Sequence, residues 1–104
     1  MGLRLGVDAT RVMKAWVYIL RCADGSYYTG HTTNLEHRVA QHRAGLGSTW
    51  IRARLPVDLV FTEEMKDRYE AVLAERRIKT WTREQKKALI RRDSARLRLL
   101  LKKR

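Results

Sequence analysis

Cysteine is nearly absent from this 104-residue chain, in which Cys22 is the only one. A single thiol cannot form an intramolecular disulfide, so nothing in the sequence requires an oxidising compartment. Long apolar stretches are also absent, because no run approaches the roughly 20 residues of a membrane-spanning helix. The first residues lack the apolar core of a signal peptide. We therefore expect a cytoplasmic protein that does not enter a membrane.

Acidic residues are scarce in the last part of the chain. The whole sequence has 23 Lys and Arg against 11 Asp and Glu, a net charge of +12. Residues 1–75 hold ten basic and nine acidic side chains, whereas residues 76–104 hold thirteen and two. Clustered positive charge favours phosphate polyanions, because binding releases condensed counterions. The basic segment therefore indicates nucleic-acid binding, with a solvated helix and an acidic membrane surface as the alternatives.

Two kinds of site are missing from the sequence. The three histidines and the single cysteine do not fall into any paired zinc-ligand spacing. Gly45-Leu46-Gly47 lacks the Gly-Lys-Ser/Thr that completes a nucleotide-binding loop. We therefore expect neither a zinc centre nor a small-molecule cofactor.

The apolar pattern predicts three strands. Residues 15–22 are rich in β-branched and aromatic side chains and are typical of a buried strand. Asp24-Gly25 favours a tight turn, which makes residues 26–31 the returning strand of a hairpin. Residues 57–62 have the composition of a third strand.

Capping and periodicity predict four helices. Thr33 and Glu36 have the spacing of a capping box, which predicts a helix from Leu35 to Arg43 that Gly45 ends. Residues 45–56 are then expected to form a loop. A second helix is expected near 68–81, and a third from Thr82 onward, because Thr82 and Gln85 repeat the capping-box spacing. A fourth, amphipathic helix packed on the core is expected over 94–104. This order predicts a three-stranded sheet covered by helices.

The chain length allows one domain. We expect residues 1–13 to be a weakly structured extension, residues 14–92 to be the domain, and residues 93–104 to be a basic helix or tail.

Several side chains suit phosphodiester chemistry. Arg38 and His42 are four residues apart, so they share one face of the predicted helix. Arg stabilises charge on phosphoryl oxygens, and His or Tyr moves protons. An ordinary solvated helix face is the alternative for this pair, and simple packing is the alternative for the strand tyrosines. Tyr27 and Tyr28 are adjacent, so only one of them can face a site.

Glu75 is an acidic residue directly before a basic run. A single carboxylate can hold Mg²⁺ when water and a substrate phosphate supply the other ligands. Pairing with Lys79, one helical turn later, is the alternative.

The order of these residues resembles the GIY-YIG nuclease superfamily, and in particular its small single-domain bacterial branch. The resemblance rests on Val17-Tyr18-Ile19, Tyr28-Thr29-Gly30, Arg38, His42 and Glu75. It covers residues 14–92 and implies an α/β (α+β) fold, in which a three-stranded antiparallel sheet is flanked by helices.

The resemblance also implies roles for these residues. Tyr18 and Tyr28 are expected to line the site and to position or activate the attacking water. Arg38 is expected to contact the scissile phosphate, and His42 to assist proton transfer. Glu75 is expected to bind one divalent metal ion, Mg²⁺ or Mn²⁺.

This sequence departs from the family pattern at three places. Val17 stands where the first glycine is expected, and Thr29 replaces an isoleucine. Some members add a late polar residue near the metal, for which Thr80, Thr82 and Gln85 are poor matches.

The resulting hypothesis is a metal-dependent endonuclease of low sequence specificity. It would act on DNA rather than RNA, on structured or single-stranded forms, in DNA repair and beside repair-complex proteins. The expected phosphate contacts are Arg52, Arg54, Arg76, Arg77, Lys79, Lys86 and Lys87. The alternatives are a non-catalytic nucleic-acid-binding module that retains the nuclease fold and an interaction subunit of a repair complex.

Overall fold

The computed structural model describes residues 14–102, so the predicted extension over residues 1–13 lies outside it. The elements run in the order β1 (Ala15–Cys22), β2 (Tyr27–Thr32), α2 (Leu35–Arg43), α3 (Thr49–Arg52), β3 (Val57–Met65), α4 (Arg68–Lys79), α5 (Arg83–Ile90) and α6 (Ser94–Lys102). The predicted α/β fold with a three-stranded antiparallel sheet is confirmed.

The sheet has the strand order β2-β1-β3, with β1 antiparallel to both neighbours. The β1–β2 hairpin is confirmed: the Cys22 N–H donates to the Ser26 carbonyl at 2.8 Å. Gly25 has a φ of +88°, which residues with a Cβ rarely adopt. β3 runs three residues beyond its predicted end, because the start of β1 continues to pair with it as far as Met65.

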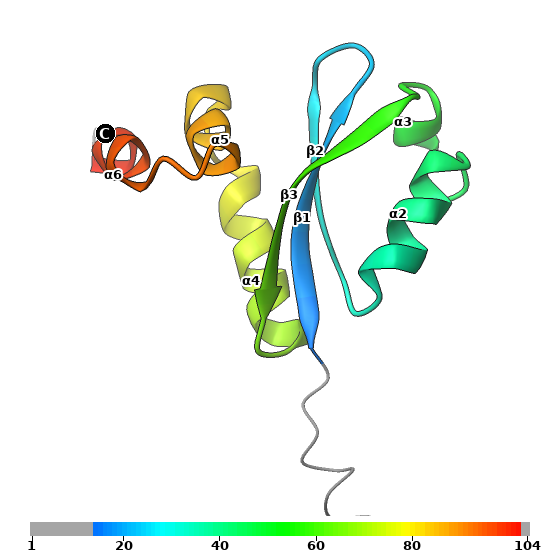
Figure 1. The fold of residues 1–104 in the computed structure, drawn as a ribbon, viewed down its shortest axis with the longest axis horizontal. Coiled ribbons are helices and arrows are strands. Elements are labelled where there is room, and N and C mark those ends of the chain that lie inside the picture. Colours follow the sequence, from blue (N-terminus) through cyan, green and yellow to red (C-terminus); the bar gives the residue numbers. More distant parts are fainter. Residues whose placement is uncertain (1–13, 103–104) are drawn as a thin grey trace, which may run out of the picture.

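The sheet separates two layers of helices. α2 and α3 lie on one side of it, and α4, α5 and α6 lie on the other (Figure 1). Alternate residues of β1 supply the two cores, because successive strand side chains point to opposite faces. One core contains Tyr18, Leu20, Cys22, Ile51 and Val57. The other contains Val17, Ile19, Phe61 and Ile78.

Two predictions about the segment after β2 are wrong. α2 is capped by Asn34, not by Thr33: the Asn34 side chain accepts from the His37 N–H at 3.2 Å. Asn is among the strongest N-caps, and its place directly before Leu35 lets its side chain reach the third helical N–H. The expected loop over residues 45–56 contains α3, which forms because Ser48 caps it and its Ile51 is fully buried.

The C-terminal helices agree more closely with the expectation. The capping box at the start of α5 is confirmed, with Thr82 and Gln85 each bonding the other's backbone N–H. The expected packing of the last helix on the core is wrong, because α6 packs on α5 and none of its residues is fully buried. No helix within residues 14–102 combines the length and apolarity needed to cross a bilayer. A domain boundary between residues 92 and 93 stays a prediction.

Candidate active site

Three of the predicted site residues meet on the sheet face that α2 covers. The Tyr18 hydroxyl and His42 Nε2 are 2.8 Å apart, and both side chains are buried. The Tyr28 ring lies 6.4 Å from the Tyr18 ring and 5.2 Å from the His42 ring, between centroids. Tyr27 packs in the opposite core, as the strand alternation predicted. The solvated-face alternative is therefore wrong for His42.

Two glycines make room for this cluster. Gly30 pairs with Tyr18 in the β1–β2 register, and a Cβ added at Gly30 would lie 2.5 Å from the Tyr18 hydroxyl oxygen. A Cβ added at Gly47 would lie 2.8 Å from His42 Nδ1. The backbone therefore comes directly against the phenol on one side and against the imidazole on the other, which encloses the pair.

Arg38 sits one helical turn before His42 and joins the cluster to an open groove. Its Nη1 donates to Gln41 Oε1 at 3.1 Å, and its Nη2 donates to the Gly47 carbonyl at 3.4 Å. The groove has a volume of about 570 Å³ and is lined by His31, Thr32, Thr33, Arg38 and Arg68. Two guanidinium groups facing one groove suit a phosphate group.

Burial controls the protonation of the buried pair. Burial raises the pKa of Tyr18 from 10.0 to about 12, although the neighbouring Arg38 opposes this shift. Burial also lowers the pKa of His42, and the positive charge of Arg38 lowers it further. Near neutral pH the imidazole is therefore uncharged and one of its ring nitrogens can accept a proton. His42 Nδ1 has no hydrogen-bond partner within the described residues.

Glu75 reaches the site from α4. Its side chain is 15% exposed, and its Oε1 lies 2.5 Å from His31 Nδ1 while its Oε2 lies 2.5 Å from Lys79 Nζ. The pairing with Lys79 that the sequence suggested is therefore present, but on a largely buried carboxylate. Burial acts to raise the pKa of Glu75, yet the hydrogen bonds from Lys79 and His31 outweigh it and the pKa is lowered.

The two halves of the site meet at the edge strand β2. His31 pairs with Val17 in the register, which places it on the face that α4 covers, whereas Tyr28 faces α2. Burial is the main cause of the raised pKa of Tyr18, and the negative charge of Glu75 makes the smallest contribution to it. The site residues therefore lie on both faces of β2: the tyrosines and His42 on the face toward α2, and His31 with Glu75 on the face toward α4.

Sequence reasoning missed His31 and Arg68. His31 directly follows Tyr28-Thr29-Gly30, and that position was the available signal. Arg68 begins α4 and is exposed; only the packing of α4 against β2 brings it to the groove beside Arg38.

The donor set for a metal ion consists of Glu75 alone. Residues 14–102 contain no cluster of three or more His, Cys, Asp or Glu side chains that could bind a metal. One carboxylate with water and substrate phosphate as the other ligands is nevertheless a common way to bind Mg²⁺. Glu75 fits such a site, and Lys79 is the cation with which the metal ion would compete.

The predicted phosphate contacts are spread over both sides of the sheet. Arg52 and Arg54 lie on or just after α3, on the same side as Arg38. Arg76, Arg77 and Lys79 lie on α4, where only Lys79 contacts a site residue. Lys86 and Lys87 lie on α5, on the side of the sheet away from α2 and α3, and Lys87 pairs with Glu84.

The three late polar residues all have structural contacts. The Thr80 hydroxyl donates to the Arg77 carbonyl at 2.7 Å. Thr82 and Gln85 form the capping box of α5, and the Gln85 amide also donates to the Leu100 carbonyl at 3.1 Å. None of the three hydrogen-bonds to Glu75.

Comparison with known proteins identifies the family. Residues 14–88 match the model of the GIY-YIG catalytic domain, a span that includes every member of the tyrosine, Arg38, His42 and Glu75 set. The chain belongs to the GIY-YIG family. Within this family it is similar to proteins named UPF0213. It is 49% identical over 73 residues to one from Halobacterium salinarum, and the match covers 70% of this chain and 95% of that protein.

Another curated relative and two solved structures are also similar to this chain. A UPF0213 protein of Staphylococcus haemolyticus is 47% identical over 77 residues, covering 74% of this chain and 94% of that protein. A solution NMR structure of a protein from E. faecalis is similar with a TM-score of 0.54 and 36% identity, over 79% of this chain and 88% of that one. The solution NMR structure of the UPF0213 protein of Bacillus halodurans is similar with a TM-score of 0.50 and 39% identity, over 74% of this chain and 82% of that one.

Proposed function

We propose that this GIY-YIG protein is a divalent-metal-dependent endonuclease that hydrolyses phosphodiester bonds in DNA with low sequence specificity. The observation that carries the proposal is the geometry around Gly30. The Tyr18–His42 hydrogen bond lies one helical turn from the half-buried Arg38, and the groove that Arg38 lines is also lined by His31, which contacts the carboxylate of Glu75. A protein that only binds nucleic acid has no need to bury a neutral imidazole against a phenol at that place.

Each residue then has a part in the hydrolysis. Arg38 and Arg68 bind the scissile phosphate in the groove and stabilise the charge that grows on its oxygens. Tyr28, which is partly exposed, positions the attacking water. Behind it, Tyr18 donates its hydroxyl hydrogen to His42 Nε2 and takes a proton from the water in exchange. The lowered pKa of His42 keeps the imidazole neutral, so it can accept the hydroxyl proton of Tyr18.

Glu75 is the residue that would hold the metal ion. When bound, Mg²⁺ or Mn²⁺ supplies Lewis-acid stabilisation to the phosphate and the leaving oxygen. His31 orients the carboxylate through Oε1. The groove cations favour low specificity, since phosphate contacts position a duplex without reading its sequence. A role in DNA repair in the cytoplasm, beside repair-complex proteins, belongs to this same proposal.

A second function is a nucleic-acid-binding module that does not cut. It is favoured by the engagement of both Glu75 oxygens by His31 and Lys79, and by the use of Thr80, Thr82 and Gln85 as helix caps.

A nicking assay tests the proposed activity. Supercoiled plasmid and a branched DNA are incubated with Mg²⁺ or Mn²⁺ and with the wild-type, Glu75→Ala or Arg38→Ala protein. We expect the wild type to nick both substrates. We expect each variant to lose at least about 100-fold in rate, the usual scale for removing one charge-stabilising group.

Glu84→Ala and Arg21→Ala are the matched controls. Both residues are exposed, Glu84 on α5 and Arg21 on β1, and neither lines the groove, so these variants should nick like the wild type. Equal nicking by all five proteins would identify a contaminating nuclease and overturn the proposal. Binding by the wild type without nicking would favour the non-catalytic module.

A further inference from the structure

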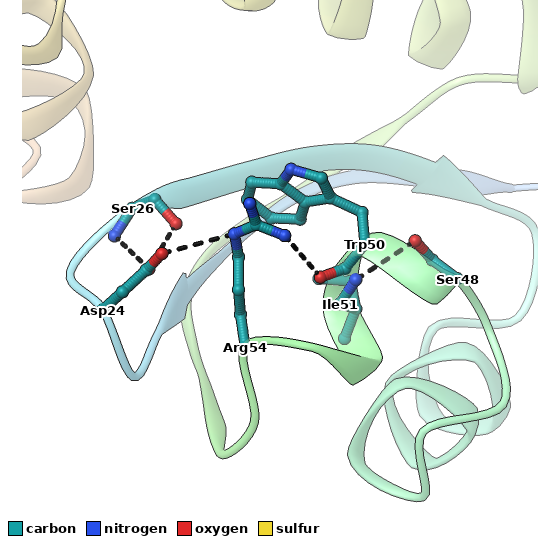
Figure 2. Close-up of polar contacts among 6 residues, drawn as sticks. All are labelled: Asp24, Ser26, Ser48, Trp50, Ile51 and Arg54. Atoms are coloured by element: carbon teal, nitrogen blue, oxygen red, sulfur yellow. Dashed lines mark hydrogen bonds and ion pairs between the residues drawn. The ribbon is translucent and has the colours of Figure 1, made fainter.

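An aromatic and a cationic side chain are stacked at the start of α3. The Arg54 guanidinium lies over the Trp50 ring, with its central carbon 3.8 Å from the ring centroid. Arg54 also donates to the Trp50 carbonyl at 2.9 Å and pairs with Asp24 of the β1–β2 turn at 3.3 Å. Figure 2 shows the guanidinium held across the indole by these contacts. The stacked indole and guanidinium form one aromatic and cationic surface.

This surface is close to the catalytic cluster. The Trp50 ring centroid lies 6.0 Å from that of Tyr28, which is itself 5.2 Å from that of His42. Tyr18, Tyr28 and Trp50 therefore form a row of rings that leads from the buried hydrogen bond to the outside. A ligand group that stacks on Trp50 would therefore lie next to the position at which Tyr28 contacts the substrate.

The exposure of Trp50 is more than the packing of α3 requires. Ile51 is fully buried and supplies the contact of α3 with the core, whereas Trp50 is 38% exposed. The partners of Arg54 do not remove it from solvent either, since the side chains of Arg54 and Asp24 are 31% and 51% exposed. An exposed ion pair of this kind contributes little to stability. The ion pair instead helps to hold the guanidinium over the indole ring.

We propose that Trp50 and Arg54 form a stacking site for an unpaired nucleobase next to the scissile phosphate. This inference rests on the proposed nuclease function, which supplies the strand whose base would stack. Nucleobases stack on aromatic rings and on guanidinium planes, and such stacking tolerates any sequence. The positive charge of Arg54 also attracts the strand that carries the base.

The site selects substrates by structure rather than by sequence. Bases inside a duplex are already stacked on their neighbours, so they reach Trp50 only at the cost of unstacking. A single strand, a flap or a mismatch presents its bases without most of that cost. The chain should therefore bind DNA with unpaired bases at the cleavage point more tightly than intact duplex.

The test compares two single strands that differ only in their bases. One is an oligothymidine of about 12 nucleotides, and the other is a backbone of the same length made of abasic nucleotides. Binding is measured by fluorescence anisotropy in the absence of divalent metal, so cleavage does not enter. The wild type should prefer the oligothymidine by about 5- to 140-fold, the range for stacking one base.

Three variants assign the preference to the site. Trp50→Leu keeps an apolar side chain on α3 but has no ring, so its preference should fall toward one while its affinity for the abasic strand stays unchanged. Trp50→Phe retains a ring and should retain most of the preference. Arg54→Lys keeps the charge without the guanidinium plane, so it should lower the preference but leave the salt dependence as in the wild type.

Nicking of a flap substrate by the wild type, run alongside, separates this inference from the proposed function. A wild type that binds both strands equally, or a Trp50→Leu protein with the wild-type preference, overturns the stacking site even if the enzyme nicks. The expected preferences together with absent nicking would support the stacking site and overturn the nuclease.

Discussion

Tyr18 illustrates how one side chain in this site depends on several others. Its hydroxyl meets His42 from α2, its ring covers the backbone of Gly30 in β2, and its pKa is raised by burial and adjusted by Arg38 and Glu75. A residue with so many constraints is sensitive to small changes in its neighbours. Substitutions at Gly30 and His42 should therefore have measurable effects on stability.

Gly30→Ala should destabilise the protein by about 1–3 kcal/mol, the usual cost of overpacking a core. The new methyl group would lie 2.5 Å from the Tyr18 hydroxyl oxygen and 2.6 Å from Cζ of the ring, so the ring must shift from its place beside His42. Urea denaturation measures the decrease. In a Tyr18→Ala background the same substitution should cost little, and an equal cost in both backgrounds would show that the clash with Tyr18 is not its cause.

His42 should make the fold less stable in mild acid. Its pKa in the folded protein lies below the ordinary 6.5, because burial and Arg38 disfavour the charged form. The unfolded chain therefore binds this proton first, and stability is lost as the pH falls below about 6.5 toward the lowered pKa. The free energy of unfolding, measured at about pH 7.5 and about pH 5.5, should fall for the wild type.

His42→Gln removes the titrating group and should reduce that fall. His37→Gln, on the exposed part of the same helix, is the matched control and should keep the wild-type pH dependence. A His42→Gln protein with the same acid sensitivity as the wild type would show that other groups are responsible. Nicking by the wild type should also weaken as the pH falls through the lowered pKa of His42, because a protonated imidazole cannot accept another proton.

At the scale of elements, α2 carries both Arg38 and His42, so its start determines where they point. The capping-box spacing and Gly45 predict the bounds Leu35 to Arg43 correctly, but they place the cap on Thr33. Thr33 and Asn34 are both good capping residues, and their sequence spacing does not distinguish them. The structure selects Asn34, whose side chain accepts the His37 N–H at 3.2 Å.

Asn34→Ala should therefore cost about 1 kcal/mol of stability, as the removal of an N-cap usually does. Thr33→Ala is the matched control and should change the stability by less than about 0.5 kcal/mol, because Thr33 is an exposed residue outside the helix. Thermal unfolding of both variants measures the difference. A larger loss of stability in Thr33→Ala than in Asn34→Ala would show that Thr33 is the N-cap.

At the scale of the whole molecule, the charge is divided between the two sides of the sheet. The described part of the basic segment forms the end of α4 together with α5 and α6, which lie across the sheet from α2 and α3 (Figure 1). The groove has its own cations in Arg38 and Arg68. We therefore expect α6 to hold DNA at a distance from the cleavage point and the groove to hold the scissile phosphate.

Salt dependence separates these two contributions. The triple variant Arg96→Gln, Arg98→Gln, Lys102→Gln should reduce the slope of log affinity against log salt by up to about 0.9 for each phosphate that is no longer neutralised. Its nicking rate at saturating DNA should stay that of the wild type. Arg68→Gln should reduce the slope by up to about 0.9 and lower the nicking rate as well. A triple variant with an unchanged slope would remove α6 from the DNA-binding surface.

Much of this protein follows from the sequence alone. The β-branched and aromatic content of 15–22, the Asp24-Gly25 turn and the Thr82–Gln85 capping box are local patterns, and the structure confirms the strand, the turn and the cap that they predicted. Local patterns can be predicted because their physical causes, side-chain alternation, positive φ and cap hydrogen bonds, act over a few residues. The order of the tyrosines, Arg38, His42 and Glu75 likewise identified the GIY-YIG family before any contact was known.

Only the tertiary structure decided how those residues act on one another. His31 and Glu75 are 44 positions apart and Tyr18 and His42 are 24 apart, so no periodicity relates them. Their contacts arise because the sheet register places these strand residues beside α2 on one face of the sheet and beside α4 on the other. Burial then sets the pKa of Tyr18 and His42, and burial depends on every element that covers a residue.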